Sequence, residues 1–227
     1  MEEIAMPETL AFDIYGTLVD PLKMEEKLEP FAGEKAGHLA KLWREKQLEY
    51  TFRRALMRRY EDFGVCTRQA LAFATQSVGL ELSREDERNL ISAYQSLPAF
   101  EDALPGLRAL RSQGHEMSAF SNGVEESARK VLEQAGLFEY LNTVISADEV
   151  KSFKPDPEVY RHACERLGGA PEEVWLVSSN PFDVIGAKSF GMRAAWVRRD
   201  PKTLLDPWDI EPDLVVRDLL HLAKELG

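Results

Sequence analysis

The sequence predicts an α/β protein with a doubly wound parallel sheet and a helical cap inserted after the first strand. Short apolar runs rich in β-branched residues alternate with amphipathic stretches through most of the 227 residues, and this alternation is typical of a parallel sheet covered by helices. One segment near the beginning interrupts the alternation, because it contains helical patterns and no convincing strand. At this length the chain can bury a core and a smaller companion domain without disulfides.

Five segments have the length and composition of buried strands: residues 9–14, 116–120, 143–146, 174–177 and 194–197. The first four end in small polar or acidic residues. In open α/β sheets the carboxyl ends of parallel strands meet at one edge, where ligands bind. We therefore expect a single ligand-binding site, built from the residues that follow these strands.

The helical cap is expected to span residues 21–97, which leaves residues 1–20 and 98–227 as a discontinuous core. The longest helix of the cap is predicted from about Gly37 to Phe63. Its buried face is predicted from apolar residues that recur every three or four positions: Phe52, Leu56, Tyr60 and Phe63.

Charge and composition exclude several classes of partner. The 28 basic and 39 acidic residues give a formal charge of −11, whereas non-specific nucleic-acid binding needs clustered basic charge, so we expect no nucleic-acid partner. No run approaches the ~18 apolar residues of a membrane span, and the start lacks a basic-then-apolar leader, so we expect neither membrane insertion nor secretion. Cys66 and Cys164 stand in no metal-binding pattern and make no disulfide framework. The expected location is the cytoplasm.

Asp13 is the first candidate for chemistry, because it ends the first strand beside the turn at Gly16. Its alternative role is an Asx-turn or a helix cap. Polar groups also follow three other predicted strands: Ser121-Asn122-Gly123, Lys154-Pro155-Asp156-Pro157 and Ser178-Ser179-Asn180-Pro181-Phe182-Asp183. Because these strand ends share one edge of the sheet, the pattern favours a reactive site around Asp13.

Five motifs together resemble the haloacid dehalogenase superfamily and, within it, the (S)-2-haloacid dehalogenase (type II) family. They are DIYGT at 13–17, WREKQLEYTF at 43–52, SNG at 121–123, KPDPEVY at 154–160 and SSNPFD at 178–183. Each motif is a weak pattern by itself, but all five occur in order and span nearly the whole chain. The resemblance implies a Rossmann-like core with a helical cap, a small-molecule 2-haloacid as substrate, a released halide, and a homodimer.

The superfamily also contains many phosphatases, and two positions argue against that activity here. In the phosphatases an acid stands two residues after the nucleophile, where this chain has Tyr15, and carboxylates follow the fourth strand, where only Asp183 remains. Mg²⁺ prefers such oxygen ligands, and a phosphoryl group needs its charge neutralised. A halide leaves as a weak base and needs no proton. We therefore expect no metal and no cofactor, with a Mg²⁺-dependent phosphatase of small phosphomonoesters or a non-catalytic protein of this fold as the alternatives.

The resemblance implies conversion of (S)-2-haloalkanoic acids to (R)-2-hydroxyalkanoic acids. Asp13 attacks the carbon that bears the halogen, forms an ester with inversion, and is freed when water hydrolyses that ester. The implied catalytic residues are Asp13, Thr17, Arg44, Lys154, Ser178, Asn180 and Asp183. The implied substrate-binding residues are Tyr15, Leu48, Ser121, Asn122, Tyr160 and Phe182.

Arg44 interrupts an apolar helical face, since it lies one and two turns before Leu48 and Phe52. A surface arginine that extends past apolar neighbours to water is the alternative. The resemblance implies instead that Arg44 receives the departing halide, with Asn122 and Phe182 completing the halide site. The neighbouring Glu45 would repel an anionic substrate if it pointed inward.

The remaining roles also come from the resemblance. Lys154 is implied to stabilise the Asp13 carboxylate, Thr17 to bond to it, and Ser121 to bind the substrate carboxylate.

Ser178 and Asn180 are implied to position the hydrolytic water. Tyr160 is implied to orient Lys154 or the substrate carboxylate, and Asp183 to be either the base for water or the partner that holds Lys154.

Helix capping offers a structural alternative for three of these positions, since Ser121 and Asn122 precede a helical pattern and Asn180 precedes Pro181.

Overall fold

A six-stranded parallel sheet forms the core of the computed structural model, which describes residues 6–227. The first five residues, on which part of the expectation about a leader depends, lie outside the described residues. The strand order is β3-β2-β1-β4-β5-β6. The strands are β1 (Thr9–Phe12), β2 (Glu116–Ser121), β3 (Val144–Ser146), β4 (Val174–Ser178), β5 (Arg193–Val197) and β6 (Leu214–Val216).

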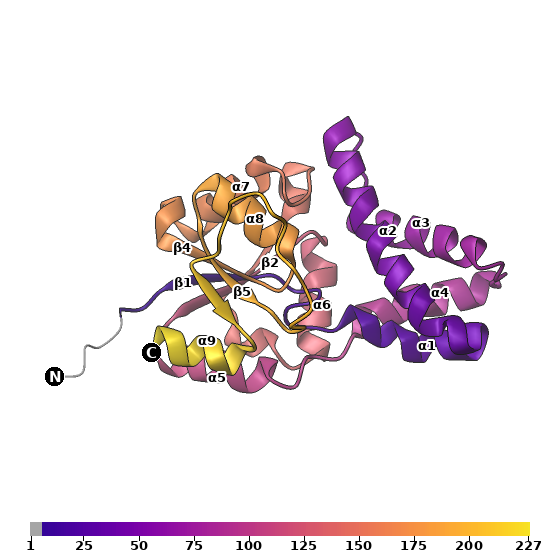
Figure 1. The fold of residues 1–227 in the computed structure, drawn as a ribbon, viewed down its shortest axis with the longest axis horizontal. Coiled ribbons are helices and arrows are strands. Elements are labelled where there is room, and N and C mark those ends of the chain that lie inside the picture. Colours follow the sequence, from indigo (N-terminus) through magenta and orange to yellow (C-terminus); the bar gives the residue numbers. More distant parts are fainter. Residues whose placement is uncertain (1–5) are drawn as a thin grey trace.

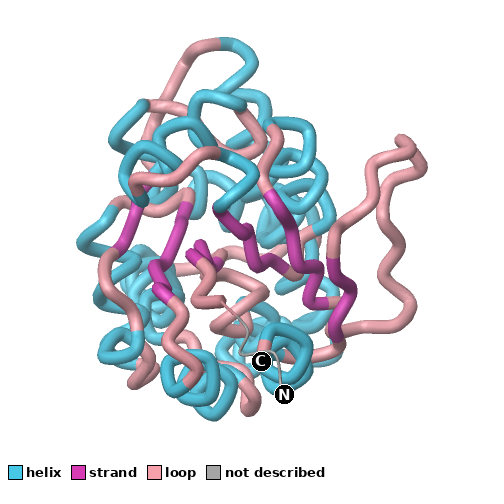
Figure 2. The backbone as a smooth tube through the Cα atoms, turned by 90° about the vertical axis from the view of Figure 1, so that its left-hand side faces the viewer, coloured by secondary structure: helices cyan, strands magenta, loops and turns pink. Residues whose placement is uncertain are grey.

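Helices cover both faces of the sheet, so the predicted doubly wound α/β class is confirmed (Figure 2). Leu10 and Phe12 of β1 pack into one apolar cluster and Ala11 into another, because successive strand residues point to opposite faces. The first face carries α5 (Ala103–Ser112), α6 (Glu125–Gln134) and α9 (Leu219–Leu226). The second carries α7 (Pro157–Leu167) and α8 (Pro181–Phe190).

The chain between β1 and β2 forms a group of helices beside the core (Figure 1). These are α1 (Met24–Ala32), α2 (Ala36–Met57), α3 (Phe63–Ser77) and α4 (Arg84–Ala93). Two adjacent connections join this helical insert to the core, since Asp20 N donates to Pro98 O and Phe100 N donates to Leu18 O. Both covalent connections between the insert and the core therefore lie at one place, directly after β1.

The predicted helix from Gly37 to Phe63 is wrong at its end, because α2 stops at Met57. Arg58 adopts a left-handed backbone conformation with φ 54°, and Asp62 then caps α3 by accepting a hydrogen bond from Val65 N.

The predicted buried face of this helix is also wrong. Leu56 is 87% exposed, and Tyr60 and Phe63 lie beyond α2. The buried face of α2 is made instead by Ala36, Leu39, Ala40, Trp43, Gln47 and Thr51.

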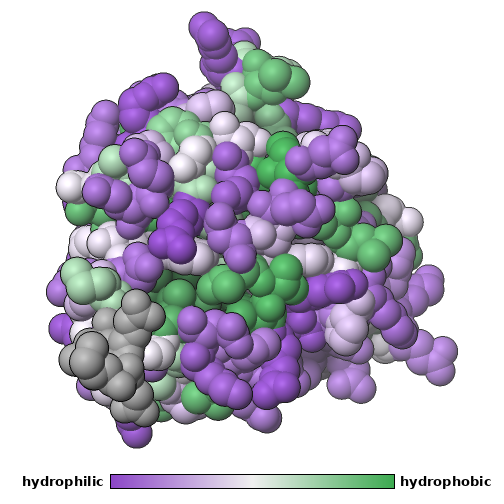
Figure 3. Space-filling model, turned by 60° about the vertical axis from the view of Figure 1, so that its left-hand side comes forward, coloured by the Kyte–Doolittle hydropathy of each residue, from purple (hydrophilic) through white to green (hydrophobic). Residues whose placement is uncertain are grey.

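Hydrophilic side chains cover most of the face shown in Figure 3, with apolar patches between them. None of the helices formed by residues 6–227 combines the length and the apolar character that a membrane crossing requires.

Candidate active site

A tight turn after β1 presents Asp13 at the carboxyl edge of the sheet. The backbone N–H groups of Leu18 and Val19 both donate to Ile14 O, which closes the turn. Gly16 has a φ of +94°, a conformation that side-chain-bearing residues rarely adopt. Asp13 N itself donates to Val177 O of β4, so the register of the sheet fixes the position of this residue.

Three side chains from distant parts of the chain hold the Asp13 carboxylate. Oδ2 accepts hydrogen bonds from Thr17 Oγ1 at 2.7 Å and from Asn180 Nδ2 at 2.8 Å. Oδ1 accepts one from Lys154 Nζ at 3.3 Å. These side-chain donors replace the backbone N–H groups that an Asx-turn or a helix cap would supply, so the structural alternative for Asp13 does not apply. The carboxylate is buried and fixed in one orientation.

Lys154 is the cation at the centre of the site. Besides Asp13, its ammonium donates to Asp183 Oδ2 at 2.9 Å and to Phe120 O at 2.9 Å, which uses all three of its protons. The side chain is only 1% exposed. Two carboxylates and one ammonium leave this group with one formal negative charge, so an anionic ligand beside it needs a further cation.

Asp183 lies behind Lys154 and is completely buried. Its Oδ2 accepts from Lys154, and its Oδ1 accepts from the Tyr160 hydroxyl at 2.9 Å. Burial raises the pKa of the Asp183 carboxyl, and the charge of Lys154 opposes that rise. Of the two roles that the sequence leaves open for Asp183, this geometry fits the partner that holds Lys154.

Of the two roles expected for Tyr160, its contacts fit the one that orients Lys154, through Asp183, rather than contact with the substrate carboxylate. Its hydroxyl donates to Asp183, and the side chain is fully buried beneath the site. Burial raises the pKa of the Tyr160 hydroxyl, so it remains a donor. Tyr160 can approach α8 this closely only because residue 186 is a glycine: an added Cβ there would lie 2.4 Å from the Tyr160 oxygen.

The capping alternatives for Ser121 and Asn122 also differ from what the structure shows. Helix α6 begins at Glu125, so neither Ser121 nor Asn122 is its N-cap. Ser121 Oγ accepts from Gly123 N, and Asn122 Oδ1 accepts from Lys154 N at 2.8 Å.

Ser178 is the last residue of β4, and Asn180 lies at the beginning of α8. Asn180 is the N-cap residue before Pro181, as predicted, but its side chain makes no capping bond. It donates instead to Asp13 and to Tyr15 O. Ser178 Oγ is buried and accepts from Asn180 N.

Arg44 extends from α2 of the insert to the turn after β1. Its Nη2 donates to Tyr15 O at 3.1 Å, the same carbonyl that Asn180 contacts, and its Nη1 donates to Gln47 Oε1 at 2.8 Å. Across residues 6–227, no carboxylate oxygen lies within 4.0 Å of this guanidinium. Glu45 is exposed and faces Lys41 at 3.9 Å, so it does not point into the site.

Apolar side chains complete the border between insert and core. Phe182 at the start of α8 packs edge-on against Phe52 of α2, with ring centroids 4.9 Å apart. Leu48 is half-buried on α2, one turn after Arg44. The structure therefore brings Phe182 and the Arg44 helix together across the border between insert and core.

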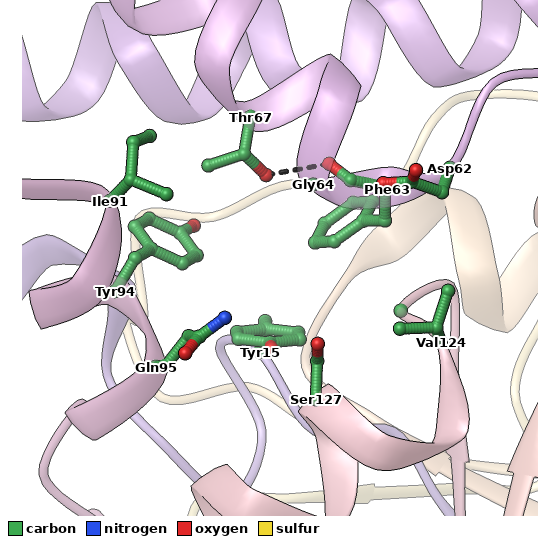
Figure 4. Close-up of a pocket in the computed structure, with 11 residues that line it drawn as sticks. Tyr15, Asp62, Phe63, Gly64, Thr67, Ile91, Tyr94, Gln95, Val124 and Ser127 are labelled. Atoms are coloured by element: carbon green, nitrogen blue, oxygen red, sulfur yellow. Dashed lines mark hydrogen bonds between the residues drawn. The ribbon is translucent and has the colours of Figure 1, made fainter. Parts of the chain in front are cut away.

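A small cavity of about 70 Å³ lies between the insert and the core, next to the ring of Tyr15 (Figure 4). Phe63 and Tyr94 line it, with ring centroids 5.6 and 5.8 Å from that of Tyr15. A second cleft, of about 340 Å³, is lined by Arg44 and Asn180 among others. Asp13 lines neither space, but its neighbours Tyr15 and Asn180 do. Phe63 and Tyr94 are site residues that no motif indicated.

The donor set around Asp13 does not suit a divalent metal ion. Within the described part of the chain, no three His, Cys, Asp or Glu side chains are grouped to hold one. The ammonium of Lys154 stands between the two carboxylates that would be the natural oxygen ligands. Cys66 and Cys164 are buried, and burial raises the pKa of both thiols to about 11, so neither supplies a thiolate.

The fold and the side chains around Asp13 define a class of hydrolase. The family model of haloacid dehalogenase-like hydrolases matches residues 7–191. (S)-2-haloacid dehalogenase 1 of Pseudomonas sp. (strain CBS-3) is 45% identical over 189 residues, which cover 83% of each chain. (S)-2-haloacid dehalogenase 4A of Burkholderia cepacia is 40% identical over 83% of this chain and 81% of its own. The chain belongs to the (S)-2-haloacid dehalogenase family, which confirms the resemblance carried by the five motifs.

A solved structure gives the same relationship. The L-2-haloacid dehalogenase of Xanthobacter autotrophicus with chloropropionic acid covalently bound superposes with a TM-score of 0.89 at 34% identity. The match covers 96% of this chain and 98% of that one. The likeness therefore extends over both the core and the helical insert.

Proposed function

We propose that this protein hydrolyses (S)-2-haloalkanoic acids to (R)-2-hydroxyalkanoic acids through an ester on Asp13. The observation that carries this proposal is the buried Asp13 carboxylate, oriented by Thr17, Asn180 and Lys154 and lacking a metal-binding set. The named relatives act on (S)-2-haloacids. The covalently bound acid in the Xanthobacter enzyme supports a covalent intermediate here.

In the first step an Asp13 oxygen attacks the carbon that bears the halogen. The new carbon–oxygen bond forms opposite the carbon–halogen bond, which breaks and leaves its electron pair on the halide, so the carbon inverts. Arg44 is the group that meets the halide charge, because its own hydrogen-bond acceptors are neutral oxygens. Asn122 and Phe182 complete the halide site in this proposal.

In the second step water attacks the carbonyl carbon of the Asp13 ester. The bond between that carbon and the oxygen of the product breaks, one proton of water goes to the departing hydroxyl, and one is released. Ser178 and Asn180 are the residues proposed to position this water. Asp183 and Tyr160 act through Lys154, which remains beside the regenerated carboxylate.

The substrate carboxylate adds a second negative charge to the net charge of the Asp13, Lys154 and Asp183 group. Ser121 is proposed to bind this carboxylate, since it is the last residue of β2, the strand that pairs with β1 next to Asp13. Tyr15 and Leu48 are proposed to contact the alkyl part. Burial raises the pKa of the Tyr15 hydroxyl, so its ring adds no charge.

Incubation with (S)-2-chloropropanoate should release chloride and give (R)-lactate. In one turnover with excess enzyme in ¹⁸O-water, the label should enter the Asp13 carboxylate and not the lactate hydroxyl, because the product oxygen comes from the enzyme. Mass spectrometry of the peptide that contains Asp13 measures this. Label in the first lactate, with none on Asp13, would show direct attack by water. No chloride at all would favour a non-catalytic protein.

Turnover should be unchanged by EDTA, because Tyr15 and Ser179 stand where metal-binding acids would be needed and Lys154 lies between the two carboxylates. The measurement is the rate of chloride release before and after chelation, with and without added Mg²⁺. Loss of activity on chelation and its recovery with Mg²⁺ would contradict this reading. Phosphate release from a small phosphomonoester under the same conditions would establish the phosphatase alternative.

We also propose a homodimer in the cytoplasm. The dimer is supported by the family resemblance, and the location by the cysteine usage of the sequence. Light scattering on the purified protein and fractionation of the producing cells test the two statements.

A further inference from the structure

We propose that Gln47 is a positioning residue for the departing halide: its neutral amide, oriented by Thr67 and Tyr94, holds the Arg44 guanidinium without cancelling its charge. This inference rests on the proposed function, in which Arg44 receives the halide. Gln47 lies within the motif at 43–52, but the resemblance assigned no role to Gln47 or to Tyr94. Their role comes from contacts between three helices of the insert.

Gln47 lies on α2, less than one turn after Arg44, and is completely buried. Its Oε1 accepts two hydrogen bonds, from Arg44 Nη1 at 2.8 Å and from the Tyr94 hydroxyl at 2.9 Å. Its Nε2 donates to Thr67 Oγ1 of α3 at 2.6 Å. A buried polar group with this many partners is costly to misplace, so the amide is held firmly.

The Thr67 hydroxyl fixes which end of the amide faces Arg44. Thr67 Oγ1 donates its only proton to Phe63 O at 2.7 Å, the dashed line in Figure 4. It can therefore only accept a hydrogen bond from Gln47. The Nε2 end of Gln47 must face Thr67, and the oxygen end must face Arg44. The carbonyl of Phe63 thus sets the orientation of a side chain on another helix.

Tyr94 fixes the same oxygen from the end of α4. Its ring packs against Trp43 and Tyr15, with centroids 5.2 and 5.8 Å apart. Burial raises the pKa of the Tyr94 hydroxyl, so it remains a donor. A change of Tyr94 to phenylalanine removes this one hydrogen bond and keeps the ring.

The neutrality of Gln47 matters as much as its position. Arg199, a second partly buried arginine near the site, forms a two-pronged ion pair with Asp102, at 2.7 and 3.2 Å. The charge of Arg199 is therefore neutralised within the protein by Asp102. The acceptors of Arg44 are Gln47 Oε1 and Tyr15 O, both neutral, so its full charge remains available to an anion. A carboxylate at position 47 would remove that advantage.

The experiment compares Gln47→Ala, Gln47→Glu and Tyr94→Phe with Arg44→Ala. Thr51→Ala is the matched control, because Thr51 is buried one turn beyond Gln47 on the same helix and its hydroxyl donates only to the backbone oxygen of Leu48. Single-turnover release of chloride and of bromide is measured from the two 2-halopropanoates. The inhibition constant of free chloride and the melting temperature are measured for each variant.

Gln47→Ala and Tyr94→Phe should slow chloride release about threefold to tenfold, the effect of one lost hydrogen bond. They should slow bromide release less, because the better leaving group depends less on Arg44. Free chloride should inhibit both variants more weakly. Gln47→Glu should weaken chloride inhibition as much as Arg44→Ala does, despite its similar shape. Thr51→Ala should change the melting temperature without changing the bromide-to-chloride ratio.

The variants distinguish a failure of this inference from a failure of the proposed function on which it rests. If Arg44→Ala loses halide release and chloride inhibition while the Gln47 and Tyr94 variants match Thr51→Ala, the inference is wrong and the role of Arg44 stands. If Arg44→Ala itself keeps the wild-type ratio and inhibition constant, the proposed role of Arg44 fails. Should Gln47→Ala not fold, Tyr94→Phe still decides the question.

Discussion

Replacing Asp13 by asparagine is expected to lower halide release by about four orders of magnitude or more, the scale of loss when a covalent nucleophile is removed. The neutral amide cannot attack a saturated carbon at a useful rate. It also turns an NH₂ group toward donors, since Thr17, Asn180 and Lys154 all donate to the two oxygens of Asp13. The measurement is chloride release in a single turnover with excess enzyme.

The control for this substitution is Asp156→Asn. Asp156 caps α7 by accepting from Glu158 N, and asparagine caps a helix equally well. We expect the control to keep the wild-type rate and both variants to melt cooperatively. An Asp13→Asn enzyme within tenfold of wild type would remove Asp13 from the reaction.

Replacing Lys154 by methionine should both inactivate and destabilise the protein. The Lys154–Asp183 pair is 1% and 0% exposed, and removing one partner of a buried pair costs about 3–5 kcal/mol in the free energy of unfolding. Lys188→Met breaks the more exposed pair with Asp213, which is 24% and 31% exposed, and should cost about 1 kcal/mol or less. Urea unfolding of the two variants measures the difference.

The Lys154→Met variant should also acquire a distinct pH dependence. Burial raises the pKa of Asp183, and Lys154 is the main group that opposes the rise. Without Lys154 the native state prefers a protonated Asp183, so the native state binds more protons than the unfolded chain. Stability is then fully present at low pH and is lost as the pH rises through the raised pKa. A free energy of unfolding that increases with pH over the same range would contradict this assignment.

Five of the six strands were predictable because their residues are buried on both faces and form short apolar runs. Strand β6 was missed because it is only partly buried and exposes Val215, whereas β3, which is equally short and also lies at a sheet edge, is buried throughout. The end of α2 was missed for a different reason. Apolar residues continue at helical spacing past Met57, and the break at Arg58 depends on a left-handed backbone conformation that neither a glycine nor a proline announces.

The candidate site was predictable to the extent that it follows strand ends. The carboxyl ends of β1 and β4 meet, so Asp13 and Asn180 had to lie close together, and they do. The position of Tyr160 was not predictable, because it depends on how closely α7 approaches α8 at Gly186. The contact between Gln47, which lies in the motif at 43–52, and Tyr94 was equally unpredictable. Their contact joins residues 47 positions apart on different helices, and no local pattern encodes it.

The strand order also governs when the protein becomes reactive during its own synthesis. Lys154 and Asn180 leave the ribosome 141 and 167 residues after Asp13, a delay of roughly ten to thirty seconds at usual translation speeds. Strand β1 pairs with β2 on one side and with β4 on the other, so its hydrogen bonding in the sheet cannot be complete before β4 has been synthesised. We therefore expect a growing chain that meets a halogenated acid to carry an unaligned, solvated carboxylate, and alkylation of Asp13 to begin only after β4 and Asn180 have been made.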